Sequence, residues 1–261
     1  MSSRVLVYHG LGANENSTKH LVDALKANLI PSQYSVQAVS PEGIANGSIL
    51  SESTALLAFG GGYTTGFAKA LGSDGIQNVK DYVLNGGSYL GFGAGGYFGC
   101  DFIEFDVGGP LEKFSEREIR FYPGIGRGPL NPSFRYGTHK GACAVPIKIL
   151  TDSANSAFDA YLDGGCAFYP SDPPKPDSPV KEVVSVANYM DLPNSPAAIV
   201  KTVVGQNGIT VLSGIHLEYD VLSVVDSEPV LEPLRKKFTE SKASQEEAFL
   251  SLLKLLRLNT V

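Results

Sequence analysis

The chain has 261 residues, of which 43% are hydrophobic and 18% charged, and this ordinary globular composition excludes an intrinsically disordered protein. The 21 basic and 27 acidic residues give a formal charge of −6, and the only basic run is the short Arg235–Lys237. We therefore expect no nucleic-acid or membrane partner. No apolar run reaches the roughly 18 residues of a membrane span, and the N-terminus lacks the pattern of a signal peptide.

Three cysteines, Cys100, Cys143 and Cys166, are scattered along the chain without CxxC spacing. An odd, scattered set argues against a disulfide framework and against a thiolate metal site. No pair of histidines has the spacing of metal ligands either. The sequence predicts a reduced, cytoplasmic protein with no metal and no cofactor.

The first 100 residues alternate short apolar runs with helical patterns. Strands are predicted at 5–8, 34–39, 55–59 and 88–91. Ser17 is expected to cap a helix in which leucines recur every four residues at positions 21, 25 and 29. A second helix is predicted over 75–84, ending at Asn85-Gly86-Gly87. Strands that alternate with helices favour a mostly parallel sheet covered on both faces.

The segment between about 100 and 180 is less regular and contains a proline-rich loop at 169–179. Because proline interrupts central strands, we interpret this segment as β-rich insertions and long loops. Strands are predicted again at 183–188, 198–204 and 209–213, and Asn207-Gly208 indicates a hairpin between the last two. A final helix over 246–256 presents one apolar face to the core. Without a repeat or linker, residues 1–261 are predicted to form a single domain.

A glycine-rich segment follows the strand predicted at 88–91. Gly91 and Gly95 match the small-residue frame of a nucleophile elbow, a strained strand-to-helix turn that exposes its central residue. The central residue here is Gly93, which has no side chain with which to attack a substrate. The segment fits equally well a glycine turn used for close packing or for anion binding at a helix N-terminus.

Two further segments carry candidate chemistry. His216 and Glu218 are two residues apart, so in an extended backbone they share a face. The carboxylate could then fix the tautomer of the imidazole, as in a catalytic triad; a solvated surface pair is the alternative. The glycines at 60–62 follow another predicted strand, where backbone N–H groups could bind an oxyanion or simply form a turn.

Together these segments resemble class I glutamine amidotransferase-like domains, and within them the branch found as the N-terminal domain of eukaryotic biotin-protein ligases and as stand-alone proteins. The resemblance covers nearly the whole chain, through segments 5–8, 59–62, 89–99, 120–124, 126–129, 163–165 and 214–218. It implies an α/β fold, a flavodoxin-like three-layer sandwich with a mainly parallel sheet and β-rich insertions. Because no segment resembles the ligase catalytic domain, we do not expect biotin ligation.

The resemblance places the family's catalytic cysteine on Gly93, its histidine on His216 and its acid on Glu218. Without sulfur there is no covalent route, so the chain as it stands is expected to be an inactive pseudoenzyme. The implied oxyanion donors are backbone N–H groups near Gly61 or Gly62 and at Ala94. Gly93 is either natural or a substitution in a sequence whose parent carries cysteine.

Other residues have two interpretations each. Tyr97 would line the pocket or pack in the core, and Arg127 would clamp a carboxylate or phosphate or form a salt bridge that holds its loop. Cys100 lies too far along the chain to replace a nucleophile at 93 and is expected to be a buried thiol. His9 either edges the pocket or has no role, and His139 is predicted to lie on the surface.

Three hypotheses about function follow. The first is a non-catalytic amidotransferase-like domain that binds a small molecule or a partner protein at the vacated pocket. The second is a cysteine-dependent amidase or amidotransferase disabled by a change at Gly93. The third is a regulatory domain of a biotin-protein ligase. The sequence predicts neither the ligand nor the oligomeric state.

Overall fold

Strands and helices alternate through the first hundred residues of the computed structural model, which describes residues 2–150, 156–171 and 178–261. The helices are α1 (Glu15–Asn28), α2 (Pro41–Ala45), α3 (Thr64–Leu84), α4 (Ala94–Phe98), α5 (Val221–Ser227), the 3-10 helix η1 (Pro229–Leu234) and α6 (Arg235–Leu255). The first strands are β1 (Ser3–Tyr8), β2 (Tyr34–Val39), β3 (Thr54–Phe59), β4 (Ser88–Phe92), β5 (Cys100–Phe105), β6 (Lys113–Glu116) and β7 (Tyr122–Gly128). The remaining strands are β8 (Cys143–Ile149), β9 (Ala157–Leu162), β10 (Ala167–Pro170), β11 (Val180–Tyr189), β12 (Ala197–Val204) and β13 (Gly208–Ser213).

The centre of the sheet is parallel. Strands β2, β1, β3, β4 and β13 lie side by side in that order, and each neighbouring pair is parallel. This is the strand order of flavodoxin-like α/β folds, in which ligands gather at the carboxyl ends of the strands. The predicted fold class is confirmed. The hairpin predicted around Asn207-Gly208 is also present, since β12 and β13 pair antiparallel on either side of it.

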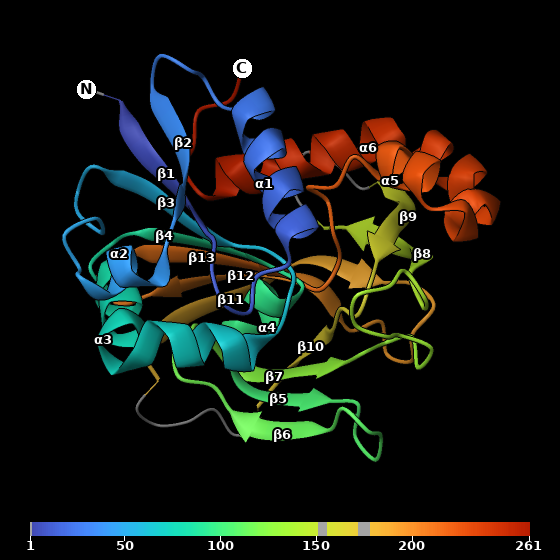
Figure 1. Cartoon of the computed structure of the whole chain (residues 1–261), viewed down its shortest axis with the longest axis horizontal. Coiled ribbons are helices and arrows are strands. Elements are labelled where there is room, and N and C mark those ends of the chain that lie inside the picture. The colour runs from blue at the N-terminus through green and yellow to red at the C-terminus, as the bar shows by residue number, and fades with distance from the viewer. Residues whose placement is uncertain (1, 151–155, 172–177) are drawn as a thin grey trace.

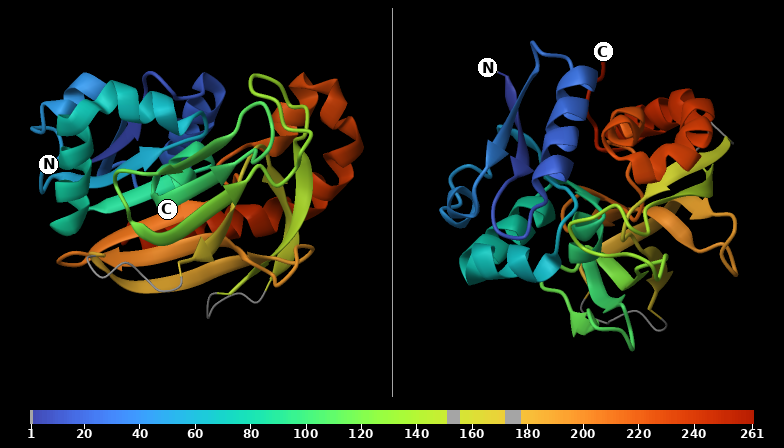
Figure 2. Two further views of the ribbon diagram at one scale, coloured as in Figure 1. Left: turned by 90° about the horizontal axis from the view of Figure 1, so that it is seen from below. Right: turned by 45° about the vertical axis from the view of Figure 1, so that its right-hand side comes forward.

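Alternation along the strands builds the two layers on either side of the sheet. Val5 and Val7 of β1 belong to the core that contains α1 and α6, whereas Leu6 and Tyr8 belong to the core that contains α3. These faces are separate because successive side chains of a strand point to opposite sides. Figure 1 shows α1 and α6 on one side of the sheet and α3 on the other, and the right-hand view of Figure 2 agrees.

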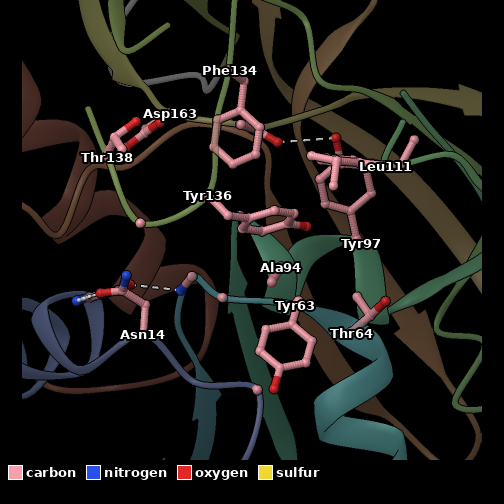
Figure 3. A pocket seen from close by; sticks show the side chains of 18 of the residues that line it. Asn14, Tyr63, Thr64, Ala94, Tyr97, Leu111, Phe134, Tyr136, Thr138 and Asp163 are labelled. Carbon is pink, nitrogen blue, oxygen red and sulfur yellow. Dashed lines mark hydrogen bonds between the residues drawn. The ribbon is translucent and has the colours of Figure 1, made fainter. Parts of the chain in front are cut away.

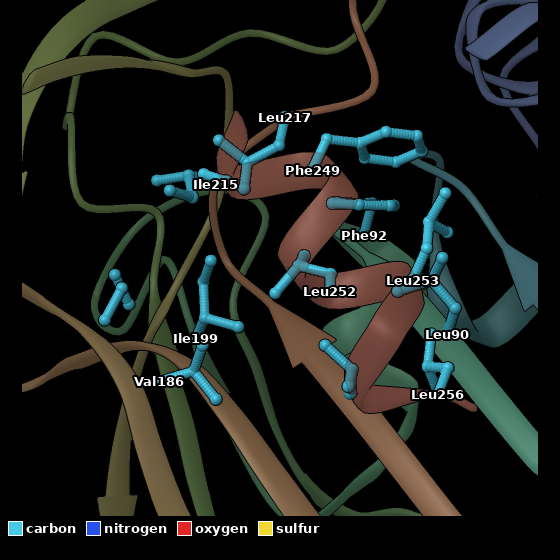
Figure 4. Packing of buried hydrophobic residues seen from close by; sticks show 14 of the residues in the cluster. Leu90, Phe92, Val186, Ile199, Ile215, Leu217, Phe249, Leu252, Leu253 and Leu256 are labelled. Carbon is cyan, nitrogen blue, oxygen red and sulfur yellow. The ribbon is translucent and has the colours of Figure 1, made fainter. Parts of the chain in front are cut away.

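The C-terminal helix α6 supplies much of the apolar surface on its face of the sheet. Leu252 and Leu253 are at most 1% exposed and pack toward Leu90 and Phe92 of β4 (Figure 4). The core-facing role predicted for 246–256 is confirmed, and the helix begins earlier, at Arg235. No helix within the described ranges is long and apolar enough to cross a membrane.

The insertions expected between about 100 and 180 are β-rich, as predicted. Strand β7 pairs parallel with β5 and antiparallel with β10, while β6 forms the outer neighbour of β5. Strands β8 and β9 pair with each other, and β8 joins the sheet through β11. Part of the proline-rich loop predicted at 169–179, namely 172–177, lies outside the described residues.

The first helix is capped by Asn14 rather than by Ser17, so that prediction was wrong. The Asn14 side chain accepts a hydrogen bond from the Ser17 N–H at 3.0 Å, and the helix begins at Glu15. The leucine spacing locates the buried face but not the first turn, where several polar residues in succession are possible caps.

Helix α3 starts eleven residues before the predicted helix over 75–84. Its first half contains Gly66 and Gly72, and Gly72 interrupts the helical geometry with a φ of 60°. Glycine is the weakest helix former after proline. Helix propensity therefore did not predict the first half of α3. Gly66 is required by packing, since a Cβ there would lie 2.5 Å from the Gly12 Cα.

Gly91→Ala is expected to lower the free energy of unfolding by about 2 kcal/mol or more, because overpacking without room to relax is costly. A Cβ at Gly91 would lie 2.3 Å from the Gly95 carbonyl oxygen. The matched control is Gly43→Ala in α2, where the nearest atom is a Val39 methyl group at 3.3 Å. Urea denaturation of both variants tests this, and a Gly91→Ala protein as stable as the Gly43→Ala protein would contradict the packing argument.

Candidate functional site

Segments far apart in the sequence meet where the parallel strands β3, β4 and β13 end. A Cβ built on Gly93 would lie 3.0 Å from Cε1 and 3.1 Å from Nε2 of His216, and 3.6 Å from the Gly61 Cα. The position of Gly93 is therefore in direct contact with the His216 imidazole. The carboxyl edge of a parallel sheet is where α/β proteins build their sites, because the loops after neighbouring strands converge there.

Gly93 occupies a sharp turn between β4 and α4. Its φ of 52° and ψ of −112° lie outside the regions that side chains favour. The turn is held on one side by the Gly93 N–H, which donates to the Ser213 carbonyl at 2.9 Å. On the other side Gly95 leaves no room for a side chain, since its Cβ would lie 2.2 Å from the Phe59 carbonyl oxygen. Close packing alone thus requires the glycine frame.

His216 and Glu218 form a buried pair. The imidazole Nδ1 lies 2.7 Å from Glu218 Oε1, and the side chains are 4% and 0% exposed. The pair is therefore not a solvated surface pair. Because Nδ1 faces the carboxylate, Nε2 is the nitrogen that faces Gly93. The second carboxylate oxygen, Oε2, is buried and has no hydrogen-bond partner among the described residues.

The surroundings of His216 favour its protonated form. Burial by itself lowers the pKa of the imidazole, because a charged ring is poorly solvated in the interior. The charge of Glu218 and its hydrogen bond raise the pKa, as do the charge and backbone of Asp163, and the net result is a raised pKa. A carboxylate bound to Nδ1 is the arrangement that holds a catalytic imidazole in one orientation.

A cavity of about 1310 Å³ opens beside this pair (Figure 3). The predicted site residues that line it are Gly61, Gly62, Gly93, Ala94, Tyr97 and His216. Glu218 does not line the cavity, since it contacts the opposite nitrogen of the imidazole. The cavity is larger than the roughly 300–1,000 Å³ of many small-molecule sites.

The predicted hydrogen-bond donors separate into two groups. The Gly61 N–H donates to the Ser17 hydroxyl at 2.7 Å, so it is already engaged and does not serve as a donor to a ligand. The N–H groups of Gly62 and Ala94 make no hydrogen bond within the described part of the chain. Of the candidates, these two are the donors left for a ligand.

Arg127 lies outside the cavity lining, contrary to the ligand-clamp interpretation. Its guanidinium pairs with Glu104 of the neighbouring strand and lies 4.7 Å from the centroid of the Tyr169 ring. This ion pair links the neighbouring strands β5 and β7, whereas the sequence suggested a salt bridge that holds a loop. Tyr97 combines both of its interpretations: it is 4% exposed, lines the cavity, and donates from its hydroxyl to the Gly164 carbonyl at 3.2 Å.

The natural cysteines are not placed to act at the Gly93 position. Cys100 and Cys166 are fully buried, Cys143 is partly buried, and burial raises the pKa of all three thiols. None of the three lines the cavity, and neither does His9. Within residues 2–150, 156–171 and 178–261, no group of three or more His, Cys, Asp or Glu side chains is placed to hold a metal ion.

A second polar cluster, which no sequence pattern predicted, lies on the cavity wall. His139, predicted to lie on the surface, has Nδ1 2.9 Å from the Tyr161 hydroxyl and 3.6 Å from Asp163 Oδ2. Asp163 raises the pKa of His139 against the opposing effect of burial. Asp163 belongs to segment 163–165, on which the family resemblance partly rests. No sequence pattern indicates that it lies next to His139.

Comparison with known proteins identifies relatives over almost the whole chain. Residues 3–261 match the family described as "Biotin-protein ligase, N terminal". An uncharacterized protein of Chlamydia muridarum is 33% identical over 262 residues, covering 99% of this chain and 96% of that protein. The biotin–protein ligase of Schizosaccharomyces pombe is 29% identical over 238 residues, which are 89% of this chain but only 35% of the ligase.

Solved structures agree on the fold. A crystal structure of a glutamine amidotransferase superposes with a TM-score of 0.52 and 17% identity, over 82% of this chain and 90% of that one. An exo-β-1,4-mannosidase from Opitutaceae bacterium strain TAV5 gives a TM-score of 0.51 and 13% identity, over 99% of this chain and 36% of that one. At these identities the likeness concerns the fold alone.

Replacing Glu218 by Gln is expected to lower the pKa of His216 from above its ordinary value of about 6.5 to below it, because burial remains while the negative charge is lost. The raised pKa makes the folded state bind an extra proton, so the stability it contributes is present at low pH and is lost as pH rises through the folded-state pKa. The advantage of the unsubstituted protein over Glu218→Gln should therefore be larger at pH 6 than at pH 9.

NMR titration of the imidazole Cε1–H resonances measures the pKa, and urea denaturation at the two pH values measures the stability. The His216 signal is assigned by its absence from a His216→Gln spectrum. The same His216 midpoint in the Glu218→Gln protein would contradict the pairing.

Proposed function

The chain belongs to the biotin-protein ligase N-terminal family, as the sequence predicted, and from this we propose that it is a ligand-binding member with an amidotransferase-like site that lacks its nucleophile. The observation that carries the proposal is the contact between the Gly93 position and the buried His216–Glu218 pair. In this proposal the turn at Gly93 is a nucleophile elbow with a glycine in the place of the nucleophile.

A cysteine at this position would complete a nucleophile–base–acid unit with His216 and Glu218. A thiol there would lie against Nε2 of His216, which could accept its proton while Glu218 stabilised the resulting imidazolium. With glycine no bond to a substrate carbon can form. In enzymes with such a unit, loss of the nucleophile leaves at most about 10³–10⁴-fold acceleration over water, from binding and oxyanion stabilisation.

The remaining parts of the site still support binding. Gly62, Ala94 and His216 all line the cavity of about 1310 Å³, and the N–H groups of the first two make no hydrogen bond within the described residues. Preformed cavities with a few converging polar groups are the usual form of small-molecule sites. A ligand carbonyl or carboxylate could therefore be held where an active relative would hold the reacting group.

A second candidate function is regulation of a biotin-protein ligase. It rests on the match to the S. pombe ligase, of which this chain spans about a third. In that case the cavity or its rim would contact a ligase catalytic domain. A pull-down of the purified catalytic domain by this chain at micromolar concentration tests it, and absence of the complex would reject it.

We expect a Gly93→Cys variant to carry a thiol with a depressed pKa, because an adjacent imidazolium stabilises a thiolate. The iodoacetamide rate should reach half its maximum at least about one pH unit below the 8.5 of a free cysteine. At pH 6 the variant should react several-fold faster than free cysteine, although a thiolate of lower pKa is intrinsically less nucleophilic.

Two controls separate the thiol from its surroundings. The unsubstituted chain reports the background of Cys100, Cys143 and Cys166. Gly93→Ala imposes the same backbone strain without a thiol, so its stability shows what the strain alone costs. A folded Gly93→Cys protein whose thiol titrates like free cysteine would reject the proposed site.

A further inference from the structure

Two exposed tyrosines stand on the walls of the cavity next to the Gly93 position. Tyr63 is 42% exposed and Tyr136 is 46% exposed, and both line the cavity. Tyr63 precedes α3, whereas Tyr136 belongs to the loop between β7 and β8. Figure 3 shows their rings on either side of Ala94 as viewed there. Large aromatic surfaces left exposed inside a cavity are characteristic of ligand sites.

The Tyr136 ring is held in place by other aromatic rings. Its centroid lies 4.9 Å from that of Phe134 and 5.9 Å from that of Phe105. Phe105 in turn packs edge-on against Tyr97 at 5.7 Å. This chain of rings joins Tyr136 to α4 and β5, so its exposed face is preorganised.

The polar end of the cavity offers hydrogen-bond donors. The N–H groups of Gly62 and Ala94 are not engaged within the described residues, and Nε2 of His216 faces the same region. Because Gly93 has no side chain, an oxygen atom of a ligand can approach where a nucleophile would otherwise stand. This end suits a group that only accepts hydrogen bonds, which is the property of a carboxylate.

The cavity wall carries charges of both signs. Asp163 and Glu228 both face His139, at 3.6 and 3.9 Å. Glu112 accepts a hydrogen bond from the Gly108 N–H at 2.6 Å. The lining also contains Lys113 and Lys140, neither of which forms an ion pair in the part of the chain that is described. Asp163 and Glu228 are paired with His139, and the two lysines are able to attract a carboxylate that lies near them.

We propose that the cavity binds an aromatic carboxylate, with the flat ring between Tyr63 and Tyr136 and the carboxylate at the Gly62 and Ala94 N–H groups beside His216. This inference rests on the proposed function and names its ligand class. A bicyclic ring with a short acidic side chain uses both the donor end and the aromatic walls.

Titration with 2-naphthylacetate, followed by naphthalene fluorescence, tests the proposal. The chain has no tryptophan, so the protein's own emission comes from tyrosine and stays apart from that of the probe. We expect saturable binding with a Kd below about 1 mM, in keeping with the binding energy per atom of small ligands. In competition, cyclohexylacetate and 2-(2-naphthyl)ethanol should each bind at least several-fold more weakly, since the first lacks the aromatic face and the second the carboxylate.

Variants then locate the binding. Tyr63→Leu and Tyr136→Leu should each weaken the binding of 2-naphthylacetate by roughly two- to tenfold, the range that aromatic pairing gives. The matched control is Phe114→Leu, which changes an aromatic residue that is 64% exposed and lies outside the cavity lining. Its affinity should equal that of the unsubstituted chain.

Absence of saturable binding would overturn the proposal. So would a protein that carries both Tyr63→Leu and Tyr136→Leu and binds 2-naphthylacetate as tightly as the unsubstituted chain. Equal binding of the alcohol and the carboxylate would do the same. These results are distinguishable from failure of the proposed function, because the thiol of Gly93→Cys would still titrate below free cysteine if only the ligand class were wrong.

Discussion

The site depends on one hydrogen bond between two buried groups, His216 Nδ1 and Glu218 Oε1, at 2.7 Å. A carboxylate with no exposed surface is tolerated only when it is paired, and removing one partner of such a pair typically costs about 3–5 kcal/mol. The pair fixes the imidazole so that Nε2 faces Gly93. The orientation of the ring follows from this contact, and the protonation state that it favours follows from Glu218 together with Asp163.

Glycine packing brings the other segments up to the imidazole. Gly91 and Gly95 allow the turn after β4 to fold back against β3, and a Cβ on either would lie within 2.3 Å of a carbonyl oxygen. These glycines are therefore explained by sterics whether or not the site is catalytic. Gly93 differs from them: the atoms nearest to a Cβ there would be those of the His216 ring, at 3.0 Å, and the Gly61 Cα, at 3.6 Å. A side chain at residue 93 would thus be restrained mainly by the backbone φ of 52° and by contact with the His216 ring, and not by a clash with a carbonyl oxygen.

Local patterns predicted the parallel strands and the position of the His–Glu pair, because period-two alternation and residue spacing are properties of short segments. They did not predict that Ser17 occupies the Gly61 N–H or that Arg127 pairs with Glu104, since these contacts join residues 44 and 23 positions apart. The contacts of His139 were not predicted for the same reason: its partners Tyr161 and Asp163 are distant from it in the sequence and come close only in the folded chain. The resemblance to a family placed Gly93, His216 and Glu218 in one site, which spacing alone could not do.

The central claim is that His216, held by Glu218, faces residue 93 at the distance where a Cβ on that residue would touch the ring. A high-resolution crystal structure of the unsubstituted protein at neutral pH measures this most directly. The account predicts Nδ1 within hydrogen-bond distance of Glu218 and the opposite edge of the ring in van der Waals reach of a Cβ position on Gly93. An imidazole turned away from residue 93, or a Glu218 side chain pointing to solvent, would contradict it.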